Sequence, residues 1–228
     1  MAQLIMVRHG QSIWNLENRF TGWTDVELSD QGIEEAKKAG QLIYRTGIDI
    51  DIAFTSVLKR ANDTLTYILK QMHKEHLEVK KCWRLNERHY GALQGLNKSE
   101  TALKFGEQQV HLWRRSFDVL PPLLDEDDPR NPKFDALYKG IPHLPLGESL
   151  ESCLHRVLPY WYSDIYPELK KGNNVLIVAH GNSLRSLMMF LDQLTKKEVL
   201  DLELPTGLPV IYTFDQNIQV ISKKSLTL

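Results

Sequence analysis

The chain has 228 residues, 42% of them hydrophobic and 25% charged, and its formal net charge at pH 7 is -1. This composition is typical of a globular protein and argues against disorder, and the length predicts a single domain over residues 1–228. The balanced charge provides no basic field for nucleic acid, so we expect no nucleic-acid partner. Any anion site must instead be a local cluster of arginines.

Two further features bear on the compartment. No apolar stretch approaches the roughly 18 residues of a membrane span, and no basic leader opens the chain. Cys82 and Cys153 are isolated, in neither metal-binding nor redox spacing, and are expected to be buried thiols in a reducing environment. We therefore expect a cytoplasmic protein with no membrane partner.

The first predicted strand leads directly into reactive side chains. Residues 4–7 form a continuous apolar run, which is typical of a strand covered on both faces of an α/β sheet. Ligands of such sheets bind outside the carboxyl ends of the strands. Arg8 and His9 are therefore expected in a crevice, followed by Ser12 and Asn15 as donors suited to an anion.

A loop and then a helix are predicted after this strand. Residues 14–32 are rich in Asn, Gly, Asp and Thr and read as a loop over the crevice, where Thr21 and Gly22 offer a hydroxyl and an amide. Ser29 is a suitable N-cap for a helix with apolar residues at a spacing near 3.6, and Gly47 ends it. This helix would cross over to a second parallel strand.

Further apolar runs predict strands at residues 50–54 and 175–179, and residues 77–83 also read as a strand. Each is followed by polar residues, as the first strand is, and these residues are expected to gather along the same rim of the sheet. They are Arg60, then Glu87, Arg88, His89 and Tyr90, and finally His180, Gly181 and Asn182.

Residues 98–147 are predicted to form an insert or lid. A polar helical stretch from Ser99 precedes a short helix packed through Val110, Leu112 and Trp113, which leaves Arg114 and Arg115 as adjacent cations. Prolines between residues 121 and 145 exclude a long helix there.

The C-terminal third completes the α/β pattern. Residues 148–169 are helical by periodicity, with a kink or junction at Pro159, and residues 184–194 predict another helix. Two runs at 209–214 and 218–222 predict an edge hairpin.

The motifs RHGQSIWN, FTGW, LNERHYGALQGLNK, WRRS, PLGESL and AHGNSLR occur in this order along the chain. With them the chain resembles the cofactor-dependent phosphoglycerate mutases of the histidine phosphatase superfamily over nearly its whole length. The resemblance implies an α/β fold, a three-layer α/β/α sandwich with a mostly parallel central sheet and a lid-like insert. It also implies interconversion of 3-phosphoglycerate and 2-phosphoglycerate.

The resemblance also implies a role for each matching residue. His9 would be the nucleophile that becomes phosphorylated, Arg8, Arg60 and His180 would surround the phosphoryl group, and Glu87 would donate and accept the proton. The substrate-binding positions would be Ser12, Asn15, Thr21, Gly22, Arg88, His89, Tyr90, Lys98, Arg114, Arg115, Gly181 and Asn182. A histidine nucleophile surrounded by guanidinium groups suits phosphoryl transfer, whose catalysis is mainly positioning and charge stabilisation.

The implied cofactor is 2,3-bisphosphoglycerate, which primes the enzyme, and no metal is implied. The implied partners are phosphoglycerates and further copies of the chain in a dimer or tetramer. Two departures from the family pattern stand out. Gln11 occupies a position where many relatives have Glu, and the chain stops at Leu228, so gating by a longer tail is not carried over.

Three other functions compete with the mutase. A bisphosphoglycerate mutase is disfavoured by Ser12, because relatives dedicated to that synthesis tend to have Gly there. A simple phosphatase is disfavoured by the insert and by paired Arg114 and Arg115. A noncatalytic protein that binds phosphorylated metabolites would have no need of His9, Glu87 and His180 together.

Overall fold

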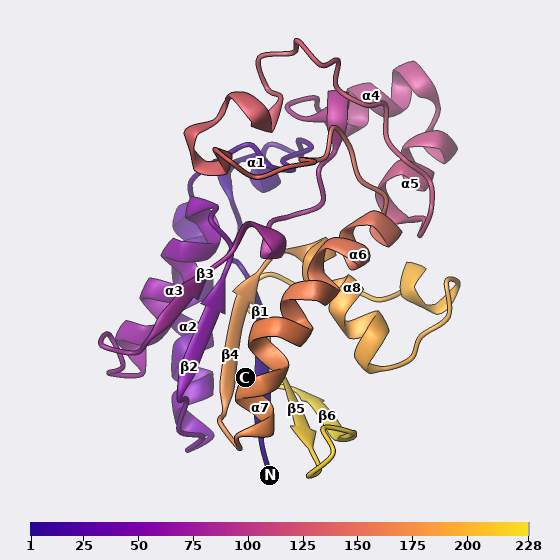
Figure 1. The fold of residues 1–228 in the computed structure, drawn as a ribbon. Coiled ribbons are helices and arrows are strands. Elements are labelled where there is room, and N and C mark those ends of the chain that lie inside the picture. Colours follow the sequence, from indigo (N-terminus) through magenta and orange to yellow (C-terminus); the bar gives the residue numbers. More distant parts are fainter. Residues whose placement is uncertain (228) are drawn as a thin grey trace.

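A six-stranded β-sheet forms the centre of the computed structural model, which describes residues 1–227 (Figure 1). Its strands are β1 (Gln3–Arg8), β2 (Ile52–Thr55), β3 (Val79–Lys81), β4 (Val175–Ala179), β5 (Pro209–Phe214) and β6 (Val220–Ser225). They lie in the order β3-β2-β4-β1-β5-β6. β1 to β4 pair in parallel and β5 pairs antiparallel with both β1 and β6, so the predicted mostly parallel sheet is confirmed.

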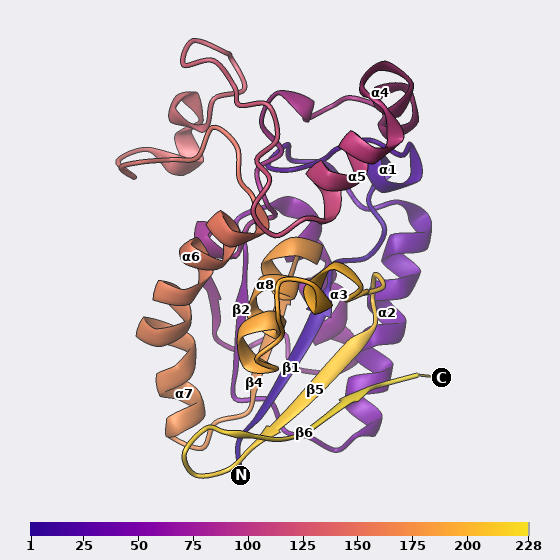
Figure 2. The ribbon, with the colours of Figure 1, turned by 90° about the vertical axis from the view of Figure 1, so that its right-hand side faces the viewer.

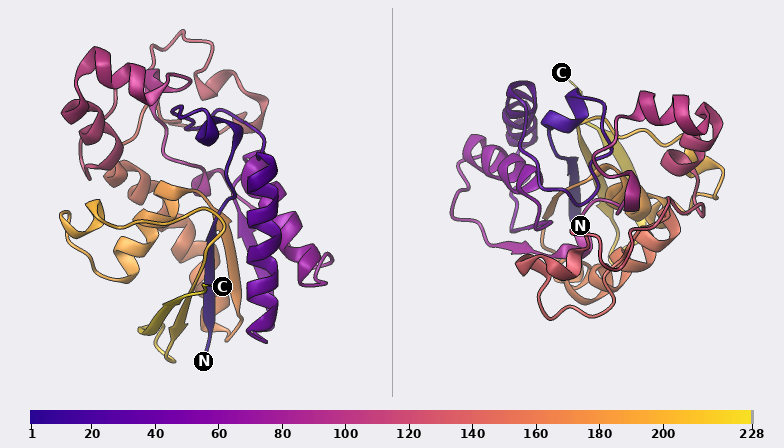
Figure 3. Two further views of the ribbon diagram at one scale, coloured as in Figure 1. Left: turned by 180° about the vertical axis from the view of Figure 1, so that it is seen from behind. Right: turned by 90° about the horizontal axis from the view of Figure 1, so that it is seen from above.

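Helices cover both faces of this sheet (Figures 1 and 2). The helices are α1 (Ile13–Leu16), α2 (Asp30–Arg45), α3 (Lys59–Gln71), α4 (Lys98–Phe105), α5 (Glu107–Arg115), α6 (Leu150–Tyr160), α7 (Tyr166–Lys170) and α8 (Gly181–Leu191). Short 3-10 helices lie at Trp83–Leu85, Gly91–Leu93, Pro132–Phe134, Ala136–Tyr138 and Glu198–Leu200. α2 and α3 cover one face and α6, α7 and α8 the other, which confirms the three-layer α/β/α sandwich (Figure 3).

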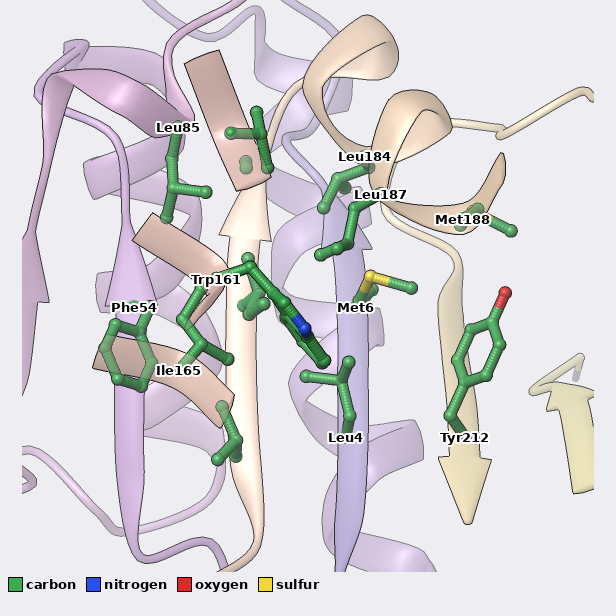
Figure 4. Packing of buried hydrophobic residues seen from close by; sticks show 14 of the residues in the cluster. Leu4, Met6, Phe54, Leu85, Trp161, Ile165, Leu184, Leu187, Met188 and Tyr212 are labelled. Carbon is green, nitrogen blue, oxygen red and sulfur yellow. The ribbon is translucent and has the colours of Figure 1, made fainter. Parts of the chain in front are cut away.

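The alternation of side chains along β1 shows how the layers are held together. Leu4 and Met6 pack into the core beneath α6 to α8, where Trp161 lies next to them and Phe54 of β2 lies farther along the same face, beside Ile165 (Figure 4). Their neighbours Ile5 and Val7 pack into the core beneath α2 and α3. An uninterrupted apolar run is thus what a strand buried on both faces requires.

The loop after β1 lies tightly against the start of α2. A Cβ added to Gly10 would come within 2.1 Å of the Gly32 carbonyl oxygen, so neither backbone could approach as it does with a larger residue at Gly10. Ser29 caps α2 as predicted, because its hydroxyl accepts the Gly32 N–H at 3.1 Å. This packing holds the residues after β1 at the rim of the sheet.

Several predicted boundaries were wrong for local reasons. β3 covers only Val79–Lys81, because Trp83–Leu85 forms a 3-10 helix that turns the chain toward the rim. α8 begins at Gly181 rather than at residue 184, with His180 as its N-cap. A capping box between Ser12 and Asn15 creates the short helix α1 in a segment predicted as loop.

Two packing predictions also need correction. Leu112 is 37% exposed, because it lies on the opposite side of α5 from the buried Val110 and Trp113. Cys153 is buried as predicted, whereas Cys82 is only half-buried.

The predicted helix at 148–169 is broken into three parts. α6 and α7 are separated by a π-helical segment at Trp161–Ile165 that begins two residues after Pro159. The junction at Pro159 is therefore confirmed. The edge hairpin is also confirmed, although its second strand starts at Val220.

Residues 98–147 lie beyond the carboxyl ends of the parallel strands (Figure 1). They contain α4, α5 and a long irregular stretch with two 3-10 helices, as the prolines predict. Within residues 1–227, no helix is both long and apolar enough to cross a membrane.

Candidate active site

A cavity of about 150 Å³ opens at the carboxyl ends of β1 and β4. Its walls are strongly cationic, since six arginines and Lys98 face only two carboxylates, those of Glu87 and Glu203. The arginines are Arg8, Arg19, Arg60, Arg114, Arg115 and Arg185. Such a surface attracts a compact polyanion.

Most of the predicted site residues line this cavity together. They are Arg8, His9, Asn15, Thr21, Gly22, Arg60, Glu87, Tyr90, Lys98, Arg114, Arg115, Gly181 and Asn182. His180 lies directly behind the wall, with its ring centroid 4.9 Å from that of His9. Residues that are far apart in the sequence therefore meet at the carboxyl edge of the sheet, as the strand pattern predicts.

His9 is held with one ring nitrogen available to a substrate. Its Nδ1 lies 2.7 Å from the Gly10 carbonyl oxygen, and because a carbonyl only accepts, Nδ1 must carry the hydrogen. Nε2 is then the unprotonated nitrogen, and it accepts a hydrogen bond from Arg60 Nε at 3.3 Å. This tautomer places the ring lone pair on Nε2, which can attack a phosphoryl group once its hydrogen bond with Arg60 is exchanged for the substrate.

The surroundings of His9 keep it neutral. Burial and the charges of Arg60 and Arg8 lower its pKa well below the usual value, against a smaller opposing effect of the Gly10 carbonyl. Burial also lowers the pKa of Arg60 to about 10, which still leaves that guanidinium charged at pH 7. A neutral imidazole thus lies beside permanent cations.

Arg60 is itself fixed by the loop before α2. Its Nη1 donates to the Thr24 carbonyl at 3.0 Å and its Nη2 to the Gly22 carbonyl at 2.8 Å. The glycine at residue 22, with φ of 54°, allows the turn that directs this carbonyl inward. The FTGW motif therefore positions an arginine of α3 against His9.

Ser56 orients the second histidine. Its hydroxyl accepts the Leu58 N–H at 3.2 Å and lies 2.7 Å from His180 Nε2, so its own hydrogen is free to be donated to that nitrogen. We infer that Ser56 donates to Nε2, so that the ring hydrogen is on His180 Nδ1, which is buried and has no partner among the described residues. Burial and then the charge of Arg60 lower the pKa of His180 well below its usual value. His180 is therefore a neutral donor next to His9.

We expect both imidazoles to remain neutral, protonated on Nδ1, between pH 5.5 and 8. Long-range ¹H–¹⁵N NMR spectra would show this as two histidines that do not titrate, because protonation below pH 6.5 is opposed by burial and by Arg60. Ser56→Ala should give His180 a mixture of tautomers and leave His9 unchanged. Titration of His9 near pH 6.5 in the ligand-free chain would contradict this arrangement.

Glu87 is positioned by backbone amides from two segments. Its Oε1 accepts the N–H groups of Arg88 at 2.8 Å and Asn182 at 3.0 Å. Its Oε2 lies near Gly181, where an added Cβ would be 3.6 Å from this oxygen and 3.4 Å from Arg8 Nε. One carboxylate oxygen is thus fixed by two backbone amides, and the other lies near Gly181, which Arg8 at the end of β1 also approaches.

A buried ion pair holds the loop that carries Glu87. Arg156 Nε and Glu148 Oε1 are 2.6 Å apart, and both side chains are almost completely buried. Arg156 also donates to the carbonyls of Asn86 at 3.1 Å and Glu87 at 3.0 Å. Burial is the largest single effect on the pKa of Arg156 and lowers it, but the charge and hydrogen bond of Glu148, together with Cys153 and Glu87, outweigh burial and the pKa is raised. Arg156 was not predicted as a supporting residue, although its partner Glu148 belongs to the PLGESL motif.

Arg88, His89 and Ser12 do not line the cavity. Arg88 Nη2 donates to the Tyr90 hydroxyl at 3.0 Å and to the Arg114 carbonyl at 2.7 Å, so it links the Glu87 loop to α5. The His89 ring packs against Trp23, and the Ser12 hydroxyl accepts the Asn15 N–H. The structure therefore places these three behind the residues that face the cavity.

Four lining residues were not predicted as site residues: Arg19, Arg185, Glu203 and Leu204. Arg185 is buried and its Nη1 donates to Asn182 Oδ1 at 3.1 Å. Its position one helical turn after Asn182 in the AHGNSLR motif was the available signal. Arg19 precedes the FTGW motif, whereas nothing in the local sequence marks residues 203 and 204.

Gln11 forms the connections expected of a supporting residue. Its Oε1 accepts from the Ser29 hydroxyl at 2.8 Å, and its N–H donates to Glu35 Oε2 at 2.8 Å. The glutamine side chain thus accepts a hydrogen bond from the N-cap of α2, and its backbone ties the loop after β1 to the same helix. The departure from the family pattern at this position is therefore accommodated.

This geometry suits transfer of a phosphoryl group. Guanidinium groups match the charge and shape of phosphoryl oxygens, a neutral imidazole can attack phosphorus, and a carboxylate can exchange the proton of a hydroxyl. Among residues 1–227, no cluster of three His, Cys, Asp or Glu side chains could hold a metal ion. All the groups just described come from the chain itself.

Comparison with known proteins identifies the family. The model of the histidine phosphatase superfamily (branch 1) matches residues 4–131, a range that contains His9, Arg60 and Glu87. A curated relative from Lactiplantibacillus plantarum, named 2,3-bisphosphoglycerate-dependent phosphoglycerate mutase 2, is 53% identical over 228 residues and covers 99% of both chains.

Solved structures share the fold at low identity. A mycobacterial glucosyl-3-phosphoglycerate phosphatase in complex with VO3 has a TM-score of 0.73 at 22% identity, covering 100% of this chain and 99% of its own. The phosphoglycerate mutase of Bacillus anthracis has a TM-score of 0.65 at 23% identity, and the match covers 92% of this chain and 88% of its own. The chain belongs to branch 1 of the histidine phosphatase superfamily, with the fold that its sequence predicts.

Proposed function

We propose that this chain interconverts 3-phosphoglycerate and 2-phosphoglycerate through a phosphohistidine at His9, primed by 2,3-bisphosphoglycerate. The observation that carries the proposal is the neutral His9 ring, whose Nε2 faces Arg60 in a cation-lined cavity. The 53% identity to a relative named as such a mutase supports the choice of substrate.

The residues suggest how each transfer would proceed. The Nε2 lone pair of His9 forms a bond to phosphorus as the bond from phosphorus to the glycerate oxygen breaks. Glu87 donates a proton to that oxygen, and in the reverse direction it takes the proton from the attacking hydroxyl. Arg8, Arg60 and His180 Nδ1 stabilise the phosphoryl oxygens.

The residues present fit a bisphosphorylated primer. Arg8 Nε and His180 Nδ1 are buried and have no hydrogen-bond partner among residues 1–227, and the cavity has more cations than carboxylates. Arg8 and Arg60 would hold one phosphoryl group, with Lys98, Arg114 and Arg115 holding the remaining anionic groups. The chemistry that 2,3-bisphosphoglycerate supplies is a phosphoryl group for His9.

The insert favours a mutase over a phosphatase. Lys98 at the start of α4 and Arg114 and Arg115 at the end of α5 bring cations of the insert to the cavity wall. A phosphohistidine is open to attack by water, so a mutase benefits from an insert that acts as a lid once substrate is bound. We include this closure of residues 98–147 in the proposal.

A coupled assay tests the proposal. Formation of 2-phosphoglycerate from 3-phosphoglycerate, followed with enolase, should be slow in the purified chain and should rise on addition of 2,3-bisphosphoglycerate. Release of inorganic phosphate without formation of 2-phosphoglycerate would instead indicate a phosphatase.

We expect Arg114→Ala to raise the KM for 3-phosphoglycerate at least about tenfold, because a charge-assisted contact with the substrate is lost. Release of inorganic phosphate should rise relative to mutase flux, since substrate would be held less firmly over His9. Lys104→Ala, an exposed cation of α4 outside the cavity lining, is the matched control. An unchanged KM and an unchanged ratio of the two rates would remove Arg114 from the clamp.

We further propose that the chain acts in the cytoplasm as a homo-oligomer, which the family resemblance implies. Sedimentation velocity at micromolar concentration should give a mass of two or four copies of the 26.4 kDa chain.

A further inference from the structure

Glu203 is the second carboxylate of the cavity, and it contacts a proposed substrate-binding cation. Its Oε1 lies 2.7 Å from Arg115 Nη2. The carboxylate side chain is 68% exposed and that of Arg115 is 26% exposed. The pair therefore lies at the mouth of the cavity, between the insert and the segment before β5.

The backbone that carries Glu203 is fixed from beneath. Leu204 is buried in the core, and its carbonyl accepts from Arg8 Nη1 at 2.9 Å. The N–H of Gly207 donates to the Arg8 carbonyl at 2.9 Å. From this anchored backbone the Glu203 side chain reaches Arg115 at the end of α5. Fixed neighbouring residues therefore set its position, rather than a free loop.

This contact weakens the binding of any anionic ligand that pairs with Arg115. The Glu203 charge offsets that of the guanidinium, and a ligand at the cavity mouth must either displace the carboxylate or bind close to it. Either cost grows with the negative charge of the ligand. With ionised phosphoryl groups, 3-phosphoglycerate carries a charge of about -3 and 2,3-bisphosphoglycerate of about -5.

We propose that Glu203 is a specificity-determining residue that weakens binding of the bisphosphorylated ligand relative to the monophosphorylated one. This inference rests on the proposed function. A carboxylate at this position limits retention of the most highly charged ligand, so the primer does not block the site against substrate. Because the pair is partly exposed, solvent and salt screen the effect and keep it moderate.

The test measures binding without phosphoryl transfer. Dissociation constants of 3-phosphoglycerate and 2,3-bisphosphoglycerate would be determined by isothermal titration calorimetry in the His9→Asn chain, with and without Glu203→Gln. We expect Glu203→Gln to tighten 2,3-bisphosphoglycerate by about three- to tenfold and 3-phosphoglycerate by about twofold at low salt. The difference should shrink at 0.5 M KCl.

Two variants separate charge from shape. Glu203→Asp retains the negative charge and should change the ratio of the two dissociation constants by less than about twofold. Glu34→Gln removes a carboxylate paired with Lys37 outside the cavity lining and should leave both constants unchanged.

An unchanged ratio in Glu203→Gln, or an equal change in Glu203→Asp, would overturn the inference. Mutase activity of the chain with His9 intact is measured separately. Its absence would refute the proposed function, while the ratio of dissociation constants reports on Glu203 alone.

Discussion

Replacement of His9 by asparagine is expected to abolish formation of 2-phosphoglycerate and incorporation of acid-labile phosphate. The fall in kcat should be at least about 10⁴-fold, because an amide nitrogen has no lone pair available to attack phosphorus. Asparagine keeps a polar side chain of similar reach, so Arg60 would not be left beside an apolar surface. Rates would be followed by the coupled assay, and labelling by transfer of ³²P from 2,3-bisphosphoglycerate.

His180→Asn is the matched control for this prediction. It removes an equally buried imidazole from the same site, 4.9 Å away between ring centroids, and should slow transfer without abolishing acid-labile labelling. Labelling that persists in His9→Asn, or that disappears only in His180→Asn, would assign the nucleophile to the other ring.

The sequence predicted the parts of the site that follow directly from strand ends. Arg8 is the last residue of β1 and His9 follows it, and His180 comes immediately after β4, the parallel neighbour of β1 in the sheet. Because parallel strands end at one edge, two apolar runs that each lead into a histidine are sufficient to bring these imidazoles together. The same runs predicted strands covered on both faces, and the family resemblance implied the three-layer arrangement.

The supporting contacts could not be predicted in this way. Ser56 and His180 are 124 residues apart, and Arg156 reaches the carbonyl of Glu87 across 69 residues. Neither pairing leaves a periodic pattern, since each depends on the angle at which a helix or loop meets the sheet. The exposure of Leu112 was mispredicted for a related reason, because three apolar residues in four do not define which side of a short helix is buried.

Arg156 supports the site through the Glu87 loop, and Arg156→Met is expected to cost about 3–5 kcal/mol of unfolding free energy. The variant would leave the Glu148 carboxylate buried without its cation. It would also remove the donors to the carbonyls of Asn86 and Glu87, so kcat should fall as Glu87 loses its position. Urea denaturation and the coupled assay measure the two effects.

A second substitution separates stability from positioning. In Arg156→Met with Glu148→Gln, no uncompensated buried charge remains, and most of the unfolding free energy should return. The kcat should stay low, because methionine cannot donate to the carbonyls beside Glu87. Lys37→Met, which breaks the exposed pair with Glu34, is the control and should leave stability nearly unchanged. If the double variant regained both stability and kcat, Arg156 would serve only to neutralise Glu148, and the position of Glu87 would depend on the amides of Arg88 and Asn182 alone.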